Sequence, residues 1–265
     1  VRDWIQSKEW DGVDRFEALS DTLNSDMPPK LKKLLLGKWL IQCIELACAD
    51  KPRPAQGVLT FAGGQGLGKT SWVKTLCPLE SAIKTGVSLD PHDKDSRHMA
   101  CQAWITELGE VDGTFKRDIA ALKAFVTESE DKYRLPYASL YQTYARRTSF
   151  FASVNREDFL KDETGNRRWY VIPVTKIDYQ HGIDAQQLWA QMYRLWGKGV
   201  PYWLLPEELA QLNDHNEQFE EACPYFDKIV DKFGLANEYA CLPERFNATK
   251  VAGVIGILNP SKRDT

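Results

Sequence analysis

The run VLTFAGGQGLGKTSWVK, from Val58 to Lys74, constrains the fold more than any other part of the sequence. It joins a short apolar segment, a glycine-rich loop and a segment with helical character, and it contains G-x-x-x-x-G-K-T from Gly63 to Thr70. Glycines let successive backbone N–H groups wrap closely around an anion, and the helix that follows adds its dipole. The pattern stands directly after a strand and before a helix, which is the context that supports it. We therefore predict a phosphate-binding loop, with an ordinary glycine-rich turn as the alternative.

The residues of this loop have distinct expected roles toward a nucleoside triphosphate. The Lys69 ammonium can reach the β- and γ-phosphates, and the Thr70 hydroxyl can ligate Mg²⁺. The remaining loop positions contribute backbone groups and flexibility. The predicted nucleotide-binding residues are Gly63, Gly64, Gln65, Gly66, Leu67, Gly68, Lys69, Thr70 and Ser71.

Apolar segments that alternate with helical patterns predict an α/β fold. The expected strands are 58–62, a segment within 82–90, 103–108, 147–155 and 167–174, and a helix is expected at 117–130. Strands that alternate with helices imply a mostly parallel sheet with helices on both faces. We predict a central sheet of five strands, flanked by helical extensions at both ends of the chain.

Changes in composition along the chain predict four segments. Apolar residues recur at helical spacing between residues 30 and 49, with lysines on the other face, and prolines follow. We expect an N-terminal helical segment (1–54), a phosphate-loop core (55–176), a C-terminal helical segment (177–234) and a tail (235–265). The N-A-T-K-V-A-G pattern in the tail could begin a DNA-binding module that this chain contains only in part.

Two acids in AWITELGEVDG are candidates for the chemistry of hydrolysis. The apolar strand ends near Glu107, and Glu110 follows shortly after it. Nucleotide hydrolysis needs a carboxylate that holds the metal and a group that activates or orients the attacking water. We assign Glu107 to the Mg²⁺ and Glu110 to the water, although the two roles could be exchanged. The alternative is that both are solvent-exposed loop acids.

An amide and two arginines follow later in the chain. FFASVN ends an apolar strand at Asn155, and the carboxyl ends of parallel strands are where such sheets bind ligands, so this side chain could sense the γ-phosphate or hold the water. Arg167 and Arg168 precede the next strand, where a guanidinium could act on a neighbouring subunit's nucleotide as an arginine finger. The alternative is an ion pair within the subunit, with Glu107, Asp158 or Asp162.

The chain carries, in this order, the segments WDGVDRF, GGQGLGKT, WITELGE, LKAFVTESEDKYRLPY, FFASVN, DETGNRRWYVIPV and QLWAQMYRLWGKG. This series resembles the virulence-associated protein E family, whose members are P-loop ATPases of prophages and mobile islands. That family is similar to the superfamily-three helicases and to the helicase halves of phage primase–helicases. The resemblance extends from about residue 4 to 232.

The resemblance implies an AAA+-like core that assembles into a ring, commonly hexameric, and moves along a nucleic acid strand using ATP and Mg²⁺. It implies Lys69 and Thr70 as the phosphate and Mg²⁺ residues, Glu107 as the acid of the second motif, and Asn155 as the sensor. It also implies Arg167 or Arg168 as the finger. Helicases similar to this family place a DNA-contacting hairpin between the acid strand and the sensor strand, which corresponds to residues 116–147 here.

The composition of that interval suits a nucleic-acid contact. Residues 114–147 hold seven Lys/Arg and four Asp/Glu, in a chain whose net charge is −3. Tyrosines are interleaved with the basic residues, and phosphate neutralisation combined with aromatic stacking is typical of single-strand binding. The alternative is that the tyrosines pack in the core and that Lys123 and Arg134 belong to the nucleotide site. The candidate contacts are Lys123, Lys132, Arg134, Arg146 and Arg147.

These features together predict an ATP-hydrolysing motor that is stimulated by nucleic acid. The expected function is that of a DNA helicase in phage or mobile-element replication, acting on single-stranded or forked DNA as a homo-oligomeric ring. A primase domain or a replication partner would lie outside this chain. A nucleotide-kinase-like phosphotransferase and an ATP-dependent regulatory switch without unwinding are the alternatives.

Composition limits where such a protein works. No apolar run approaches the ~18 residues of a membrane span, and the six cysteines contain no C-x-x-C pair. We expect reduced, buried thiols, no structural metal site, no membrane partner, and a cytoplasmic location in the bacterial host cell. The chain begins at Val1 rather than Met, from which we expect a piece of a longer protein. The net charge excludes simple coating of nucleic acid, but it allows a local basic channel.

Overall fold

The computed structural model describes residues 1–109, 119–133, 140, 142–155, 160 and 166–219. Residues Val1–Glu220 form one compact unit, and Glu221–Thr265 form a second unit that lies outside the described residues. Several predictions therefore fall on residues that the structure does not describe, namely those for Glu110, Arg134, Asp158, Asp162 and the tail 235–265.

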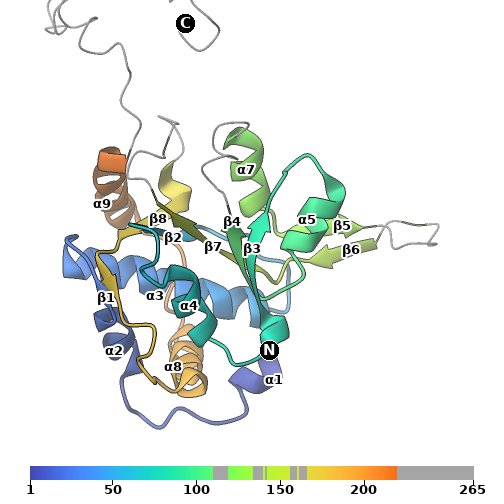
Figure 1. Cartoon of the computed structure of the whole chain (residues 1–265). Coiled ribbons are helices and arrows are strands. Elements are labelled where there is room, and N and C mark those ends of the chain that lie inside the picture. The colour runs from blue at the N-terminus through green and yellow to red at the C-terminus, as the bar shows by residue number, and fades with distance from the viewer. Residues whose placement is uncertain (110–118, 134–139, 141, 156–159, 161–165, 220–265) are drawn as a thin grey trace, which may run out of the picture. The chain divides into compact units, whose positions relative to one another are not determined.

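A five-stranded parallel sheet lies at the centre of the first unit (Figure 1). Its strand order is β3-β4-β7-β2-β8. Strand β7 therefore lies between β4, which carries Glu107, and β2, which precedes the glycine-rich loop. This is the AAA+-like arrangement that the resemblance implies, and the predicted five-stranded α/β core is confirmed. The strands are β2 (Val58–Ala62), β3 (Ile83–Ser88), β4 (Ile105–Gly109), β7 (Ser149–Val154) and β8 (Trp169–Pro173).

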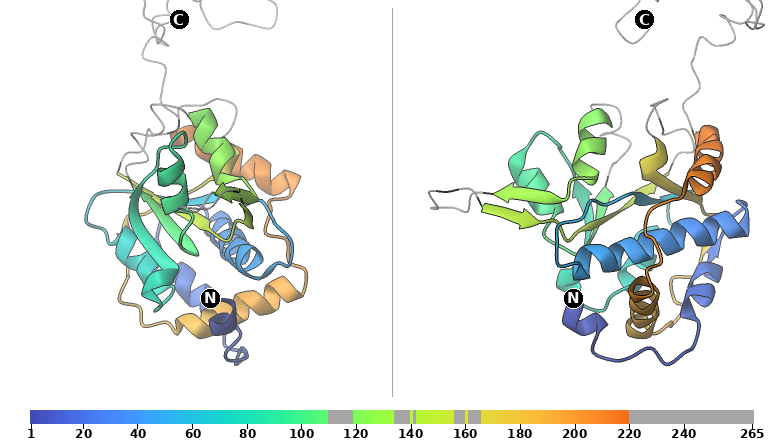
Figure 2. Two further views of the ribbon diagram at one scale, coloured as in Figure 1. Left: turned by 90° about the vertical axis from the view of Figure 1, so that its right-hand side faces the viewer. Right: turned by 180° about the vertical axis from the view of Figure 1, so that it is seen from behind.

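Helices cover both faces of the sheet, because neighbouring residues of each strand point to opposite faces and both sets are apolar (Figure 2). On one face, Phe61 and Phe151 pack with helices α3 (Pro29–Cys48), α4 (Lys69–Thr75) and α8 (Ala185–Gly197). On the other face, Phe150 packs with helices α5 (Lys94–Ala100) and α7 (Ile119–Val126). The sheet is therefore buried between two apolar layers.

The N-terminal helices belong to the same core as the sheet. Helix α1 (Arg2–Ile5) and helix α2 (Arg15–Asp21) precede α3, and the Trp39 indole of α3 donates a 2.8 Å hydrogen bond to the Phe150 carbonyl of β7. Together with α8 and helix α9 (Pro206–Asn216), these helices lie in the one unit that holds the phosphate loop. The described residues of the expected segments 1–54 and 177–234 therefore lie in the same unit as the core.

Helix α3 differs from the amphipathic helix that its spacing predicts. Lys32 and Lys38, expected on a solvated face, are buried. The Lys32 ammonium donates to the Ser20 and Leu23 carbonyls at 2.9 and 2.6 Å, and Lys38 pairs with Glu208 of α9 at 3.1 Å. Flanking elements cover this helix on several sides, and they supply partners for its charged side chains.

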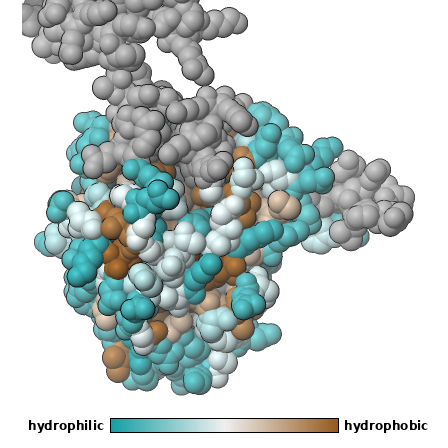
Figure 3. Space-filling model, viewed as in Figure 1, coloured by the Kyte–Doolittle hydropathy of each residue, from teal (hydrophilic) through white to brown (hydrophobic). Residues whose placement is uncertain are grey.

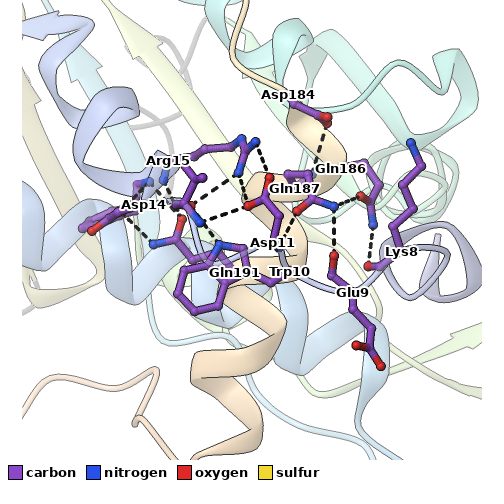
Figure 4. A network of polar contacts seen from close by, with 12 residues as sticks. Lys8, Glu9, Trp10, Asp11, Asp14, Arg15, Asp184, Gln186, Gln187 and Gln191 are labelled. Carbon is purple, nitrogen blue, oxygen red and sulfur yellow. Dashed lines mark hydrogen bonds and ion pairs between the residues drawn. The ribbon is translucent and has the colours of Figure 1, made fainter.

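Three glutamines of α8 fasten the N-terminal segment to the core (Figure 4). Gln187 accepts a 2.9 Å hydrogen bond from the Asp11 backbone N–H, and Gln186 donates to two carbonyls of the same segment at 3.0 Å. Gln191 donates to the Asp14 carboxylate at 2.7 Å, which holds the pKa of Asp14 below its ordinary value. The motifs WDGVDRF and QLWAQ, which are far apart in sequence, are thus in direct contact.

Hydrophobic residues are dispersed over the surface in the view of Figure 3, where they form small separate groups between hydrophilic ones. No helix among the described residues is long and apolar enough to cross a membrane. Cys43, Cys48 and Cys77 are buried free thiols and Cys101 is half-buried, whereas Cys223 and Cys241 lie outside the described residues.

A two-stranded antiparallel hairpin extends from the core where the resemblance implies one (Figures 1 and 2). It consists of β5 (Glu130–Tyr133) and β6 (Gln142–Ala145). Arg146 follows β6, and its side chain is 0% exposed. Its guanidinium pairs with Asp131, donates to Glu128 at 3.1 Å, and lies 4.3 Å from the centroid of the Phe125 ring. This arginine therefore anchors the base of the hairpin in the core.

Replacing Arg146 by Met should destabilise the fold strongly. The substitution leaves Asp131 buried without its charged partner, and the loss of one member of a buried pair costs about 3–5 kcal/mol. Lys132→Met on the exposed side of the same hairpin is the matched control, with an expected change within about 0.5 kcal/mol. Denaturant unfolding of both variants measures the free energies, and equal stabilities would contradict the anchoring role.

Candidate functional site

Strand β2 delivers the glycine-rich loop to the carboxyl edge of the sheet, and α4 begins at Lys69. Two of its glycines are required by their surroundings. A Cβ on Gly63 would lie 2.4 Å from the Val174 carbonyl oxygen. Gly68 has φ +88° and packs against Tyr179, so that a Cβ there would lie 2.4 Å from ring atom Cδ1. The loop is therefore held closely by the chain that follows β8.

The Lys69 ammonium lies inside the loop and reaches across to strand β7. It donates hydrogen bonds to the Gly63 and Gly64 carbonyls at 2.6 and 2.8 Å and to Asn155 Oδ1 at 3.0 Å. The residue is 6% exposed, and burial lowers the pKa of its ammonium while the nearby Glu107 carboxylate opposes the shift. Lys69 and Asn155, which were predicted from separate motifs, thus belong to one site.

Glu107 accepts hydrogen bonds from two hydroxyl groups at the same edge of the sheet. The side chain is 3% exposed, and its Oε1 accepts hydrogen bonds from Thr70 Oγ1 and from Ser153 Oγ, each at 2.7 Å. Thr70 lies in the first turn of α4, Glu107 belongs to β4, and Ser153 belongs to β7. Oxygen ligands of this kind, carboxylate and hydroxyl, suit Mg²⁺. The residues present therefore fit the predicted metal.

Ser153 is a site residue that the sequence analysis missed. A single serine in an apolar strand gives little signal, but it stands two positions before Asn155, and alternate strand residues share a face. Its partner Glu107 lies on the adjacent strand, since β4 pairs with β7 in parallel. The position could have been found by combining the strand pairing with the predicted roles of the two neighbours.

The loop borders a cavity of about 360 Å³. The walls include loop residues, residues at the end of β7, and Tyr179 from the chain that follows β8. Gly63 and Gly64 belong to the site through the carbonyls that accept from Lys69. The lining residues are Gln65, Gly66, Leu67, Gly68, Lys69, Thr70, Ser71, Ser153, Asn155 and Tyr179.

Arg167 and Arg168 lie at the opposite edge of the sheet from the loop. They belong to the 3₁₀ turn η2 (Asn166–Arg168), which directly precedes β8, and Trp169 is in register with Val58 at the start of β2. From Val58, β2 continues for four residues to Ala62, about 13 Å at 3.3 Å per residue, and the loop begins beyond it at Gly63. Arg167 is exposed and Arg168 is half-buried. The alternative of an ion pair with Glu107 does not fit this placement, because Glu107 lies at the other edge.

The predicted nucleic-acid contacts have different environments. Arg146 is buried in the core and Lys123 is buried on α7, so neither side chain is accessible to a phosphate group of a nucleic acid. Arg147 donates to the Leu46 and Ala49 carbonyls at 2.9 and 2.6 Å, at the end of α3. Lys132 is exposed on β5, and Arg134 lies outside the described residues. The charge count of the interval did not distinguish these environments.

The fold and the site define an α/β protein with a glycine-rich loop and an acid–hydroxyl cluster at the carboxyl edge of its sheet. The chain belongs to the virulence-associated protein E-like family, because the profile of the virulence-associated protein E-like domain matches residues 5–221. The resemblance derived from the motifs is therefore confirmed. No curated protein matches the chain.

Solved structures of the NrS-1 C-terminal region are similar to this chain. One A-form apo structure of that region has 15% sequence identity and a TM-score of 0.53, with 87% of this chain and 57% of that chain covered. A second A-form apo structure has 16% identity and a TM-score of 0.45, with 82% and 46% covered. The chain thus spans about half the length of these structures, and the first of them supports the fold.

Substitution by Ala should destabilise the fold at loop position Gly68 but not at loop position Gly64. Gly68→Ala forces a side chain into a left-handed conformation and against Tyr179, which should cost about 1–3 kcal/mol of unfolding free energy. Gly64→Ala is the matched control, because nothing lies within 4 Å of the place that its Cβ would occupy. Thermal and denaturant unfolding would show the difference, and a Gly68→Ala variant as stable as the control would contradict the packing.

Proposed function

We propose that this chain is an ATP-hydrolysing motor that is stimulated by nucleic acid and works as an oligomeric ring. The most specific form of the proposal is a DNA helicase of phage or mobile-element replication, acting in the bacterial cytoplasm on single-stranded or forked DNA. The observation that carries it is the convergence of Lys69, Thr70 and Asn155 around one cavity, with Glu107 hydrogen-bonded to Thr70 behind its wall. Membership of the virulence-associated protein E-like family supports this role, and the similarity to the NrS-1 C-terminal region supports the fold.

The site residues suit hydrolysis in the following way. Lys69 would exchange the loop carbonyls for phosphate oxygens, which gives its buried ammonium a charged partner. Thr70 and Glu107 would hold Mg²⁺, which neutralises charge on the β- and γ-phosphates when bound. Ser153 would orient the Glu107 carboxylate through its hydrogen bond. Asn155 would contact the γ-phosphate, and Glu110 remains the proposed water activator.

The position of the arginines favours an oligomer. Arg167 and Arg168 precede β8 at the edge of the sheet away from the loop, so they do not approach the nucleotide of their own subunit. An arginine finger can act across a subunit interface, where it stabilises the charge of the transition state. A head-to-tail contact between copies of this chain would bring that edge to a neighbour's loop, and such contacts close into rings.

The hairpin is the proposed nucleic-acid contact. Lys132 is exposed on β5, and Tyr144 is 41% exposed on β6. Lys132 is in register with Thr143 and Tyr144 with Asp131, so the two side chains lie on opposite faces of the hairpin. The proposed contact therefore rests on Lys132, whose cation would neutralise phosphate. We retain Lys132 and Arg134 as contact residues and assign Arg146 to the scaffold of the hairpin. A primase domain or replication partner would be supplied from outside this chain.

Single-stranded DNA should raise the rate of ATP hydrolysis. The stimulation should weaken as salt rises, because phosphate contacts release counterions. Lys69→Ala should abolish hydrolysis with and without DNA, while circular dichroism shows an intact fold. The same samples, sized by light scattering with nucleotide bound, report the oligomer. Hydrolysis indifferent to every nucleic acid tested would favour the phosphotransferase or the regulatory switch instead.

Mixed oligomers should recover activity if an arginine acts across the interface. An Arg167→Ala/Arg168→Ala subunit keeps an intact loop, and a Lys69→Ala subunit keeps intact arginines, so each variant lacks what the other supplies. Each variant alone should be nearly inactive, since such a finger contributes about 10³–10⁵ in kcat. Hydrolysis by the mixture above the sum of the two is the expected result. Strictly additive rates would contradict action in trans.

A further inference from the structure

The chain that follows β8 runs alongside the phosphate loop and contacts it in sequential order. Val174 packs against Gly63, Tyr179 packs against Gly68, and His181 Nε2 lies 2.9 Å from the Thr75 hydroxyl at the end of α4. Between these contacts, the short strand β9 (Lys176–Ile177) pairs with β1 (Leu23–Asn24) and fixes the segment. One continuous segment therefore packs along the loop, and it contributes Tyr179 to the cavity wall.

Tyr179 is the aromatic residue of this segment. Its ring covers Gly68, where an added Cβ would lie 2.4 Å from Cδ1 and 2.9 Å from Cε1. The residue remains 42% exposed and lines the cavity together with the loop. A half-exposed ring that is fixed on one side by the backbone of a loop offers its remaining surface to the cavity.

The order of the strands sets the direction in which a nucleotide would lie. Strands β7 and β8 flank β2 on opposite sides, so Asn155 and Tyr179 approach the loop from opposite flanks. The Lys69 ammonium donates a hydrogen bond to Asn155, at the end of β7. Because the lysine of such a loop contacts the β- and γ-phosphates, these phosphates would lie on the β7 side. A nucleoside attached to the other end of the triphosphate then extends past Ser71 toward the flank that holds Tyr179.

We propose that Tyr179 is the stacking platform for the nucleobase of the bound nucleoside triphosphate, an inference that rests on the proposed function. Every base has a π-face, so a tyrosine ring binds it by stacking and by excluding water. The neighbouring His181 is engaged on both ring nitrogens, with Thr75 and with the Ile183 N–H. Tyr179 therefore supplies affinity for the nucleoside, whereas the loop supplies affinity for the phosphates.

Two probes separate these contributions in calorimetric titrations with Mg²⁺ present. ATP carries the nucleoside, and inorganic tripolyphosphate carries only the phosphates. Tyr179→Ala should weaken ATP binding about 10-fold or more, while tripolyphosphate affinity stays within about twofold of wild type. Tyr179→Phe should keep ATP affinity near wild type, because its ring can still stack. Gln180→Ala, an exposed neighbour, is the matched control and should leave both affinities unchanged.

The other outcomes overturn the proposal in distinguishable ways. Equal loss of both probes in Tyr179→Ala would mean that the ring only braces Gly68, and unchanged ATP affinity would mean that the base lies elsewhere. Both results would leave the proposed function standing. A wild-type chain that binds neither probe would overturn the proposed function and this inference together. Lys69→Ala, which should weaken both probes, shows that binding occurs at the loop.

Discussion

The buried Glu107 carboxylate is the interaction on which the arrangement of the site depends. A charged group that is 3% exposed is costly unless donors surround it, and two hydroxyls at 2.7 Å fill that role. These donors, Thr70 and Ser153, belong to the loop helix and to the neighbouring strand. Satisfying one carboxylate therefore fixes the relative positions of α4, β4 and β7. The Lys69 ammonium is held at the same edge by loop carbonyls and by Asn155, so the positions of both charged groups are fixed by hydrogen bonds.

The sequence was most informative where a local pattern has one structural solution. The run of glycines after an apolar segment predicted a strand, a loop and a helix, and the structure has β2 at the predicted strand 58–62 and α4 from Lys69. The sequence was less informative where a role depends on a neighbour that is distant in the chain. Ser153 matters because β4 lies beside β7, and Tyr179 matters because the chain after β8 turns back along the loop. No periodicity marks either position.

Charge counts were the least reliable guide, because they do not report burial. The interval 114–147 is basic in composition, yet Arg146 is enclosed by acids of the same interval, Glu128 and Asp131. In the same way, the Lys32 ammonium of α3 donates to the carbonyls of Ser20 in α2 and Leu23 in β1 rather than to solvent. A basic residue that follows acids closely in sequence can be neutralised within one hairpin, and only the paired strands show that this has occurred.

Strand β7 joins the two regions in which function is proposed. Just before it, Arg146 holds the base of the hairpin, and the Thr148 hydroxyl donates to the Cys101 carbonyl at 3.1 Å. At its other end, Ser153 and Asn155 contact the acid and the lysine of the site. The strand is six residues long and pairs with a neighbour on each side, so it is held as part of the rigid sheet. One strand of the sheet therefore connects the base of the hairpin with the cavity beside the glycine-rich loop.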